Sequence, residues 1–147
     1  MALATMRATV VFLFALLLAP SASGQIVVNT TASGTGDPGD CTLEEAITAA
    51  NSDQGVDACL AGSGADLIDF SGVDLTTPQS IAVTSELMIS ESLTIEGPGA
   101  RLLTLDGGGA TRIISALTTV DLEVSGLTFT GGDPGGFLRG GAISTSS

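Results

Sequence analysis

Hydrophobic and polar positions follow two different periods along this chain of 147 residues. From Thr42 to Asn51 (TLEEAITAAN) the apolar residues recur at offsets of three, four and seven, which is one face of an α-helix. Thr42 and Glu45 form a capping box at the helix start, and Glu44 and Glu45 lie at the positive end of the helix dipole. The pattern therefore predicts a helix over residues 42–51.

Elsewhere the apolar positions lie two residues apart, which is the period of a β-strand. Ile26 to Asn29 and Asp66 to Phe70 are typical of short strands. After Pro78 the chain becomes a series of strands of three to five residues, most of them separated by Gly, Ser, Pro or Asp. These segments lie at 81–83, 87–89, 93–95, 102–105, 112–115, 120–124 and 127–130.

The spacing of these strands favours a solenoid over a sandwich or a barrel. Strands of sandwiches are longer, and the hairpin dipeptide Asn-Gly does not separate the segments here. The phrase SLTIEGPGARLLTLDGGG at 92–109 is loosely repeated as SGLTFTGGDPGG at 125–136, as expected where successive turns of a coil stack. In such a coil Leu93 and Ile95 point into the core. Thr94 and Glu96 point outward.

The N-terminal residues predict a secretory signal peptide. Arg7 supplies a positive charge, residues 10–19 form an unbroken apolar run, and small residues follow Pro20. A membrane-spanning helix needs about 20 apolar residues, so an N-terminal membrane anchor is the weaker alternative. We place cleavage after Gly24, within two residues either way. The mature chain is then secreted or on the outer cell surface, without a membrane span.

The mature chain is strongly acidic, because all 16 acidic residues remain and Arg101, Arg112 and Arg139 are its basic residues. This balance should repel nucleic acid and anionic membranes, so neither is an expected partner. The acidic residues are scattered singly, as on a solvated surface.

Two cysteines, Cys41 and Cys59, would enter an oxidising compartment, where a disulfide is expected and a pair of free thiols is the alternative. A bond closing a loop of this length stabilises a fold by roughly 3 kcal/mol. Two cysteines without histidine are too few soft ligands for a metal site.

Two segments carry a family resemblance. CTLEEAITAAN at 41–51 and DACLAGSGADLIDF at 57–70 resemble the N-terminal region of secreted bacterial proteins named for a Cys-Ser-Leu-Arg-Glu-Ala (CSLREA) motif. Thr42 replaces the motif's Ser and keeps a capping hydroxyl, whereas Glu44 replaces its Arg. Further segments are similar to the right-handed parallel β-helix repeats of the same proteins and of polymorphic outer-membrane proteins. They lie at 91–108, 125–132 and 140–144.

The resemblance implies a mainly β fold, a right-handed parallel β-helix whose open end is capped by the helix at about 42–51. Together with the predicted signal peptide at 1–24, it divides the chain into a cap region at 25–80 with the helix and the disulfide, and first coils at 81–147. A Cys41–Cys59 bond would pin the cap to the strand near Asp66. We expect a fragment of a longer protein with an exposed strand edge.

We recognise no catalytic, cofactor-binding or metal-binding group of residues. Without histidine there is no Ser-His-Asp arrangement, and Arg101 and Arg112 are more typical of surface charges than of the base of a sugar lyase. The carboxylates of Asp106 and Asp121, or of Glu96 and Asp121, could align as in glycosidases, but chance readily makes such pairs. Asp106 before three glycines could bind calcium, although it more simply begins a tight turn.

These observations predict a secreted or cell-surface scaffold or adhesion module without catalytic residues of its own. Its expected partners are glycans or cell-surface components. The alternative is the N-terminal part of a pectate-lyase-like polysaccharide lyase or hydrolase whose active site lies beyond residue 147. Fold analogy alone supports that alternative, and fold analogy is a weak argument for function.

Overall fold

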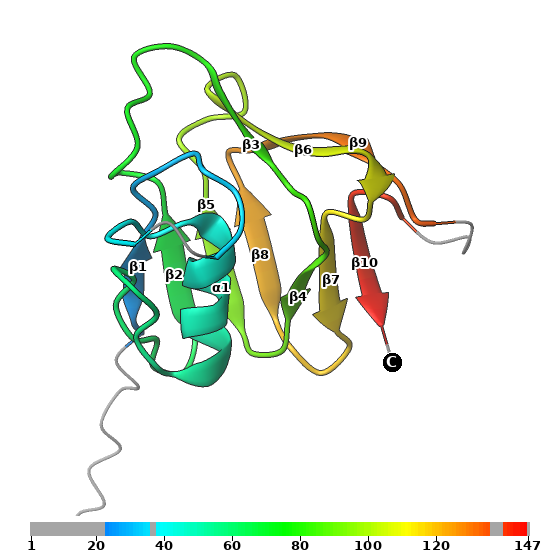
Figure 1. Ribbon diagram of the computed structural model, residues 1–147. Helices are drawn as coiled ribbons and strands as arrows, with labels where there is room; N and C mark the ends of the chain where they lie inside the picture. The colour runs from blue at the N-terminus through cyan, green and yellow to red at the C-terminus, as the bar shows by residue number, and fades with distance from the viewer. Residues whose placement is uncertain (1–22, 36–37, 136–139, 147) are drawn as a thin grey trace, which may run out of the picture.

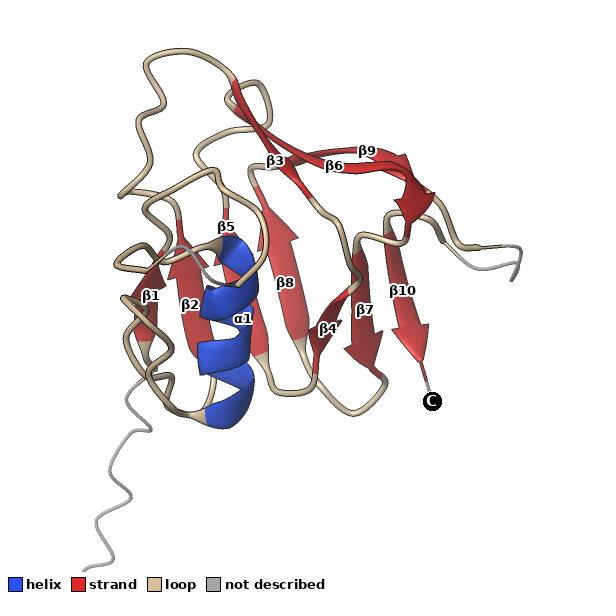
Figure 2. Ribbon diagram, viewed as in Figure 1, coloured by secondary structure: helices blue, strands red, loops and turns tan. Residues whose placement is uncertain are grey.

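A computed structural model describes residues 23–35, 38–135 and 140–146, so most of the predicted signal peptide lies outside the described residues. The described part is mainly β with one α-helix, α1 (Leu43–Ser52) (Figure 2). The strands are β1 (Gln25–Val27), β2 (Asp66–Asp69), β3 (Gln79–Ala82), β4 (Leu87–Ile89), β5 (Leu93–Glu96), β6 (Leu103–Thr111), β7 (Ile114–Leu117), β8 (Leu122–Ser125), β9 (Thr128–Gly132) and β10 (Ile143–Ser146).

The strands assemble into three sheets in the described part of the chain. Their orders are β1-β2-β5-β8, β3-β6-β9 and β4-β7-β10, and every pairing between named strands is parallel (Figure 1). From β3 onward, successive strands therefore enter the three sheets in rotation, and each strand from β3 to β7 pairs with the strand three places further along the chain. Parallel neighbours cannot be joined by a two-residue hairpin, so the intervening strands serve as the connection.

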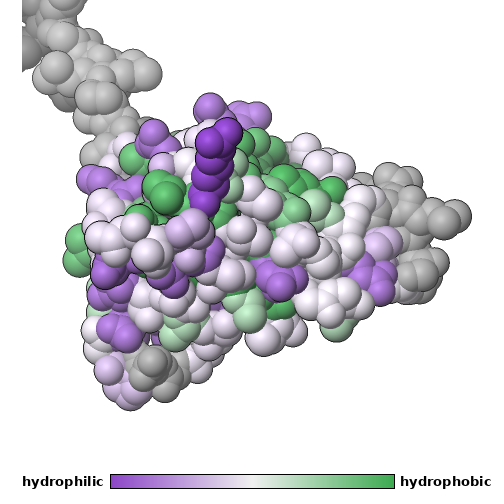
Figure 3. All heavy atoms as spheres, turned by 90° about the horizontal axis from the view of Figure 1, so that it is seen from above, coloured by the Kyte–Doolittle hydropathy of each residue, from purple (hydrophilic) through white to green (hydrophobic). Residues whose placement is uncertain are grey.

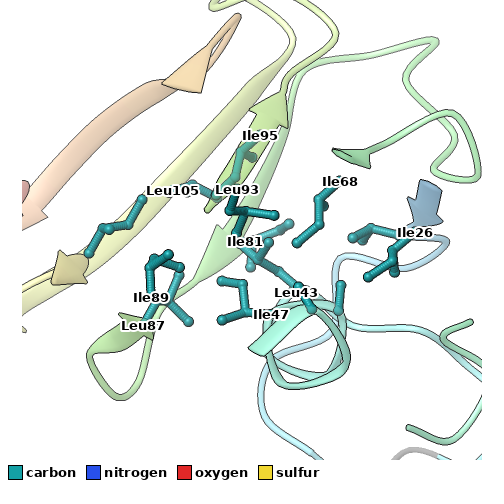
Figure 4. Close-up of a cluster of buried hydrophobic side chains, with 14 of the residues drawn as sticks. Ile26, Leu43, Ile47, Ile68, Ile81, Leu87, Ile89, Leu93, Ile95 and Leu105 are labelled. Atoms are coloured by element: carbon teal, nitrogen blue, oxygen red, sulfur yellow. The ribbon is translucent and has the colours of Figure 1, made fainter. Parts of the chain in front are cut away.

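The register aligns apolar side chains from successive strands. Ile26, Ile68 and Ile95 are direct partners in the first sheet and are all fully buried. Ile81 and Leu105 are partners in the second sheet and are also fully buried. The sheets direct these side chains toward one another and toward α1 (Figure 4), so the core is one continuous, mainly aliphatic cluster.

The strand β5 shows the alternation that its sequence predicts. Leu93 and Ile95 are buried, Thr94 is half-buried and Glu96 is exposed. The strand β6 differs from the expected segment at 102–105, because it continues through three glycines to Thr111. The register with β9 shifts between Asp106 and Thr111, so this extension is an irregular part of the ladder. A side chain at Gly107 would come within 2.7 Å of the Gly131 carbonyl oxygen, which explains why glycine is needed there.

The helix α1 begins with the predicted capping box. The Glu45 amide donates to Thr42 Oγ1 over 3.2 Å, and the Thr42 amide donates to Glu45 Oε2 over 3.1 Å. The helix packs against β1, β2 and β4 and buries Leu43 and Ile47 against the sheets (Figure 4). It ends at Asp53, whose backbone adopts the left-handed conformation with φ of 51°.

Burial decreases toward the last strands. Val124, the register partner of Ile95, is half-buried, and so is Phe129, the partner of Leu105. Ile143 of β10 is 39 % exposed, although its partner Ile114 is fully buried. The core is therefore closed at the helix end and partly open where β8, β9 and β10 end their sheets.

Candidate functional site

Two carboxylates from adjacent strands lie beside a groove at the ends of β2 and β5. The register pairs Asp69 with Glu96, and both side chains lie on the outer face because Ile68 and Ile95 point inward. The adjoining groove has a volume of about 350 Å³. We call it the Asp69–Glu96 groove, and its other lining residues are Phe70, Ser71, Val73, Leu75, Gly97 and Pro98.

Asp69 is held by hydrogen bonds on both carboxylate oxygens. Gln25 Nε2 donates to Oδ2 over 2.7 Å, and the Ser71 amide donates to Oδ1 over 2.8 Å. Partial burial by itself raises the pKa of Asp69, but the donors on Ser71 and Gln25 outweigh it and lower the pKa below its ordinary value. Asp69 is therefore an ionised acceptor at neutral pH and is unsuited to act as a general acid.

The chemistry of the groove combines negative charge with an apolar wall. Its carboxylates can accept hydrogen bonds from hydroxyl or ammonium groups, while Val73, Leu75 and Pro98 offer apolar surface. Figure 3 looks down on the end of the molecule that is uppermost in Figure 1, where hydrophilic and hydrophobic residues are interspersed. The lining of the groove likewise combines charged, polar and apolar side chains.

The carboxylate pairs considered from the sequence are not brought opposite one another. Glu96 is the register partner of Ser125, and Asp106 is the register partner of Thr130 in a different sheet. Asp121 precedes β8 and donates its amide to Ser92 Oγ. The Asp69–Glu96 pair was missed, because only the pairing of β2 with β5 makes these residues neighbours.

Asp106 lies in the tight turn that its sequence indicates. Its Oδ1 accepts the Gly108 amide over 2.9 Å, and Gly108 and Gly109 have φ values of 61° and 69°. Within the described residues, no group of three or more His, Cys, Asp or Glu side chains is placed to hold a metal ion. The observed role of Asp106 is to stabilise this glycine turn.

The two central arginines differ in their contacts. Arg112 Nη1 lies 2.8 Å from Glu86 Oε1, and its Nε donates to the Gly140 carbonyl oxygen over 3.2 Å. Arg112 thus links the segment before β4 to the segment before β10. Arg101 is exposed in the turn before β6. Neither arginine lines the Asp69–Glu96 groove.

The cap region is fastened by a disulfide and by side-chain hydrogen bonds. Cys41 and Cys59 are joined by a disulfide and are both buried. The Cys41 amide donates to Asn29 Oδ1 over 2.8 Å, and Thr42 Oγ1 donates to the Gly34 carbonyl oxygen over 2.8 Å. The hydrogen bonds of Cys41 and Thr42 therefore fix the start of α1 to the segment after β1. The disulfide fixes it to the loop that follows the helix.

Comparison of the chain with protein-family models, with curated proteins and with solved structures finds no match. Within the described residues, no helix combines the length and the apolar character that crossing a bilayer requires.

Proposed function

We propose that this chain carries the cap and successive coils of a secreted right-handed parallel β-helix of the CSLREA-motif kind, and that it serves as a scaffold or adhesion module. The rotation of β3 to β10 through three parallel sheets supports the coil. The position of α1 beside β1, β2 and β4 supports its role as the cap. The Cys41–Cys59 disulfide is compatible with an oxidising, extracellular location.

The outer faces of the sheets support a binding role. Parallel register turns single polar residues into columns, such as Ser80, Thr104 and Thr128 on the sheet β3-β6-β9. The observation that carries the proposal is the Asp69–Glu96 pair on the sheet β1-β2-β5-β8. These two carboxylates are register partners, and both line a groove with an apolar wall. A wall with repeated hydroxyl and carboxylate acceptors fits a hydroxyl-rich glycan on a cell surface.

The charge of the chain selects among glycans. The formal net charge is −12 at neutral pH, and the groove itself carries two carboxylates. A polyanionic sugar such as polygalacturonate would be repelled, whereas a neutral glycan can donate its hydroxyls to Asp69 and Glu96. We therefore propose a neutral glycan as the partner.

A panel of neutral and acidic immobilised glycans tests this proposal with the exported protein. We expect binding to neutral glycans, and we expect Asp69→Asn and Glu96→Gln each to weaken it by about tenfold, the loss of a charge-assisted hydrogen bond. Glu123→Gln, an equal charge change on β8 outside the groove, is the matched control and should bind as the parent does.

Two results would contradict the proposal. One is the absence of binding to every neutral glycan on the panel. The other is cleavage of a bound glycan, followed as new reducing ends or as the ultraviolet absorbance of an unsaturated product. Cleavage would instead support a polysaccharide hydrolase or lyase.

A further inference from the structure

A buried carboxylate lies where the predicted leader meets the folded chain. Asp66, the first residue of β2, is only 2 % exposed. Its Oδ1 accepts the Gly24 amide over 3.0 Å and the Ser63 amide over 2.7 Å. Its Oδ2 is buried and has no hydrogen-bond partner among the described residues. A buried carboxylate without a positive partner is costly, so its surroundings need explanation.

Gly24 is built into the fold at this point. Its carbonyl oxygen accepts the Leu67 amide over 2.8 Å, which extends the β1–β2 ladder by one bond. A side chain at position 24 would place its Cβ 2.6 Å from Asp66 Oδ1 and 3.1 Å from Gly62 Cα. Only glycine therefore lets the nitrogen of residue 24 approach Asp66 so closely. The preceding residue, Ser23, is exposed.

We propose that the leader is removed between Ser23 and Gly24, and that the new α-ammonium group of Gly24 forms a buried ion pair with Asp66. This inference rests on the export that is part of the proposed function. A signal peptidase would add water across the Ser23–Gly24 bond. The C–N bond breaks, the water oxygen enters the Ser23 carboxylate, and the released Gly24 amine takes up protons to become an ammonium.

This position refines the cleavage expected from the sequence, which was after Gly24. Cleavage after Gly24 would remove both the donor to Asp66 and the carbonyl acceptor of the Leu67 amide. Cleavage after Ser23 keeps both bonds and leaves the small residues Ser21 and Ser23 at the positions that a peptidase of this kind reads.

The ammonium also satisfies Asp66 better than the peptide N–H does. A peptide nitrogen offers one donor and no charge, whereas an ammonium offers three donors and a full positive charge. Charge-assisted hydrogen bonds are about twice as strong as neutral ones, and Oδ2 otherwise lacks a donor within the described part of the chain. Removal of the leader would therefore complete this site.

The first test is the N-terminus of the exported protein, measured by intact mass and N-terminal sequencing after expression of the full chain with its leader in a bacterial host. We expect a chain that begins at Gly24. A chain that begins at Gln25 or that retains Ser23 would overturn the inference. A chain retained in the cytoplasm with its leader would overturn the inference and the proposed export together, whereas failure to bind glycans would leave the inference intact.

The second test uses the absence of lysine from the sequence, which leaves the α-amino group as the sole amine of the mature chain. Acetylation at neutral pH with an N-hydroxysuccinimide ester requires the free amine. A carboxylate at hydrogen-bond distance favours the charged form, so we expect acetylation to be about tenfold slower than in Asp66→Asn or in the parent unfolded in urea.

Two further variants keep this test decisive. Asp69→Asn removes a nearby carboxylate charge that makes no contact with Gly24, so it should be acetylated at the parental rate. Gly24→Ala, checked by mass for the same cleavage position, forces the terminal nitrogen away from Asp66 and should be acetylated faster, even if Asp66→Asn does not fold. Equal rates in the folded parent and in the urea-unfolded parent would overturn the ion pair.

Discussion

Asn51 in the last turn of α1 donates its side-chain amide to the carbonyl oxygen of Met88 in β4, over 2.7 Å. The same side chain accepts the Ser90 amide at Oδ1 over 2.9 Å. One amide group thus occupies a donor and an acceptor on the edge of β4, where a neighbouring strand would otherwise pair. An edge strand with free backbone groups invites pairing with other chains, so this contact helps to close the helix end of the sheets.

Replacement of Asn51 tests this edge contact. Asn51→Ala should lower the free energy of unfolding by about 1 to 2 kcal/mol, because two hydrogen bonds to the β4 edge are lost. Urea unfolding measures the loss, and faster hydrogen exchange at the Ser90 amide locates it. Ser52→Ala is the control, since its hydroxyl bonds only to Thr48 within the helix. Its effect should stay within about 0.5 kcal/mol, and an equal effect of both substitutions would contradict the role assigned to Asn51.

Glu44 should make stability depend on pH. Its side chain is almost fully buried, and neither carboxylate oxygen has a hydrogen bond of normal geometry among the described residues. Burial raises the pKa of Glu44. Backbone N–H groups of Glu44 and Gly34 offset part of this increase, and the charge of Glu45 adds a smaller one. The protonated form therefore stabilises the fold fully below the ordinary pKa of 4.5, and this stabilisation is lost as the pH rises through the raised value.

Glu44→Gln removes this pH dependence, because the amide has the same shape and no charge. We expect the variant to be about 1 kcal/mol more stable than the parent at pH 7. The difference should disappear near pH 4, where the parent is protonated as well. Unfolding by urea across this pH range measures both effects. Glu123→Gln on an exposed carboxylate provides the matched charge change and should show no such crossover.

The disulfide should contribute strongly to a chain of this size. Cys41 and Cys59 are separated by 18 positions, and a closed loop of that length stabilises a fold by about 3 kcal/mol. Reduction should therefore lower the urea midpoint of the parent. A double variant, Cys41→Ala with Cys59→Ala, should already show the lower midpoint and should not respond to the reductant. A parent midpoint unchanged by complete reduction would contradict this contribution.

Ile68, Ile95 and Val124 are successive register partners in the sheet β1-β2-β5-β8, and truncation of their side chains should lower the free energy of unfolding by different amounts. Ile68→Ala and Ile95→Ala should each cost about 2 to 5 kcal/mol, since both side chains are fully buried. Val124→Ala should cost less than about 1.5 kcal/mol, because its side chain is half-buried and shorter. Urea unfolding of the three variants gives the comparison. A cost at Val124 equal to that at Ile95 would show that the core is closed on both sides.

Local features of this protein could be predicted from sequence because they depend on residues close together in the chain. The apolar period of the helix, the Thr42–Glu45 capping box and the inward direction of Leu93 and Ile95 all follow from the geometry of single elements. The turn at Asp106 is predictable for the same reason, since a carboxylate and the glycines after it meet within a few residues. The ends of the strands could not be predicted in this way. The extension of β6 to Thr111, for example, depends on its pairing with β9.

Three relationships were decided by the tertiary structure alone: Asp69 beside Glu96, Asn51 against the edge of β4, and Gly24 against Asp66. Each joins residues more than 25 positions apart. Asp69–Glu96 and Gly24–Asp66 depend on the register of parallel strands, and register depends on the turns between them. The contact of Asn51 depends on how α1 packs against β4. A hydrophobic pattern determines which face of a strand points inward, but it does not determine which residue of another strand will lie alongside.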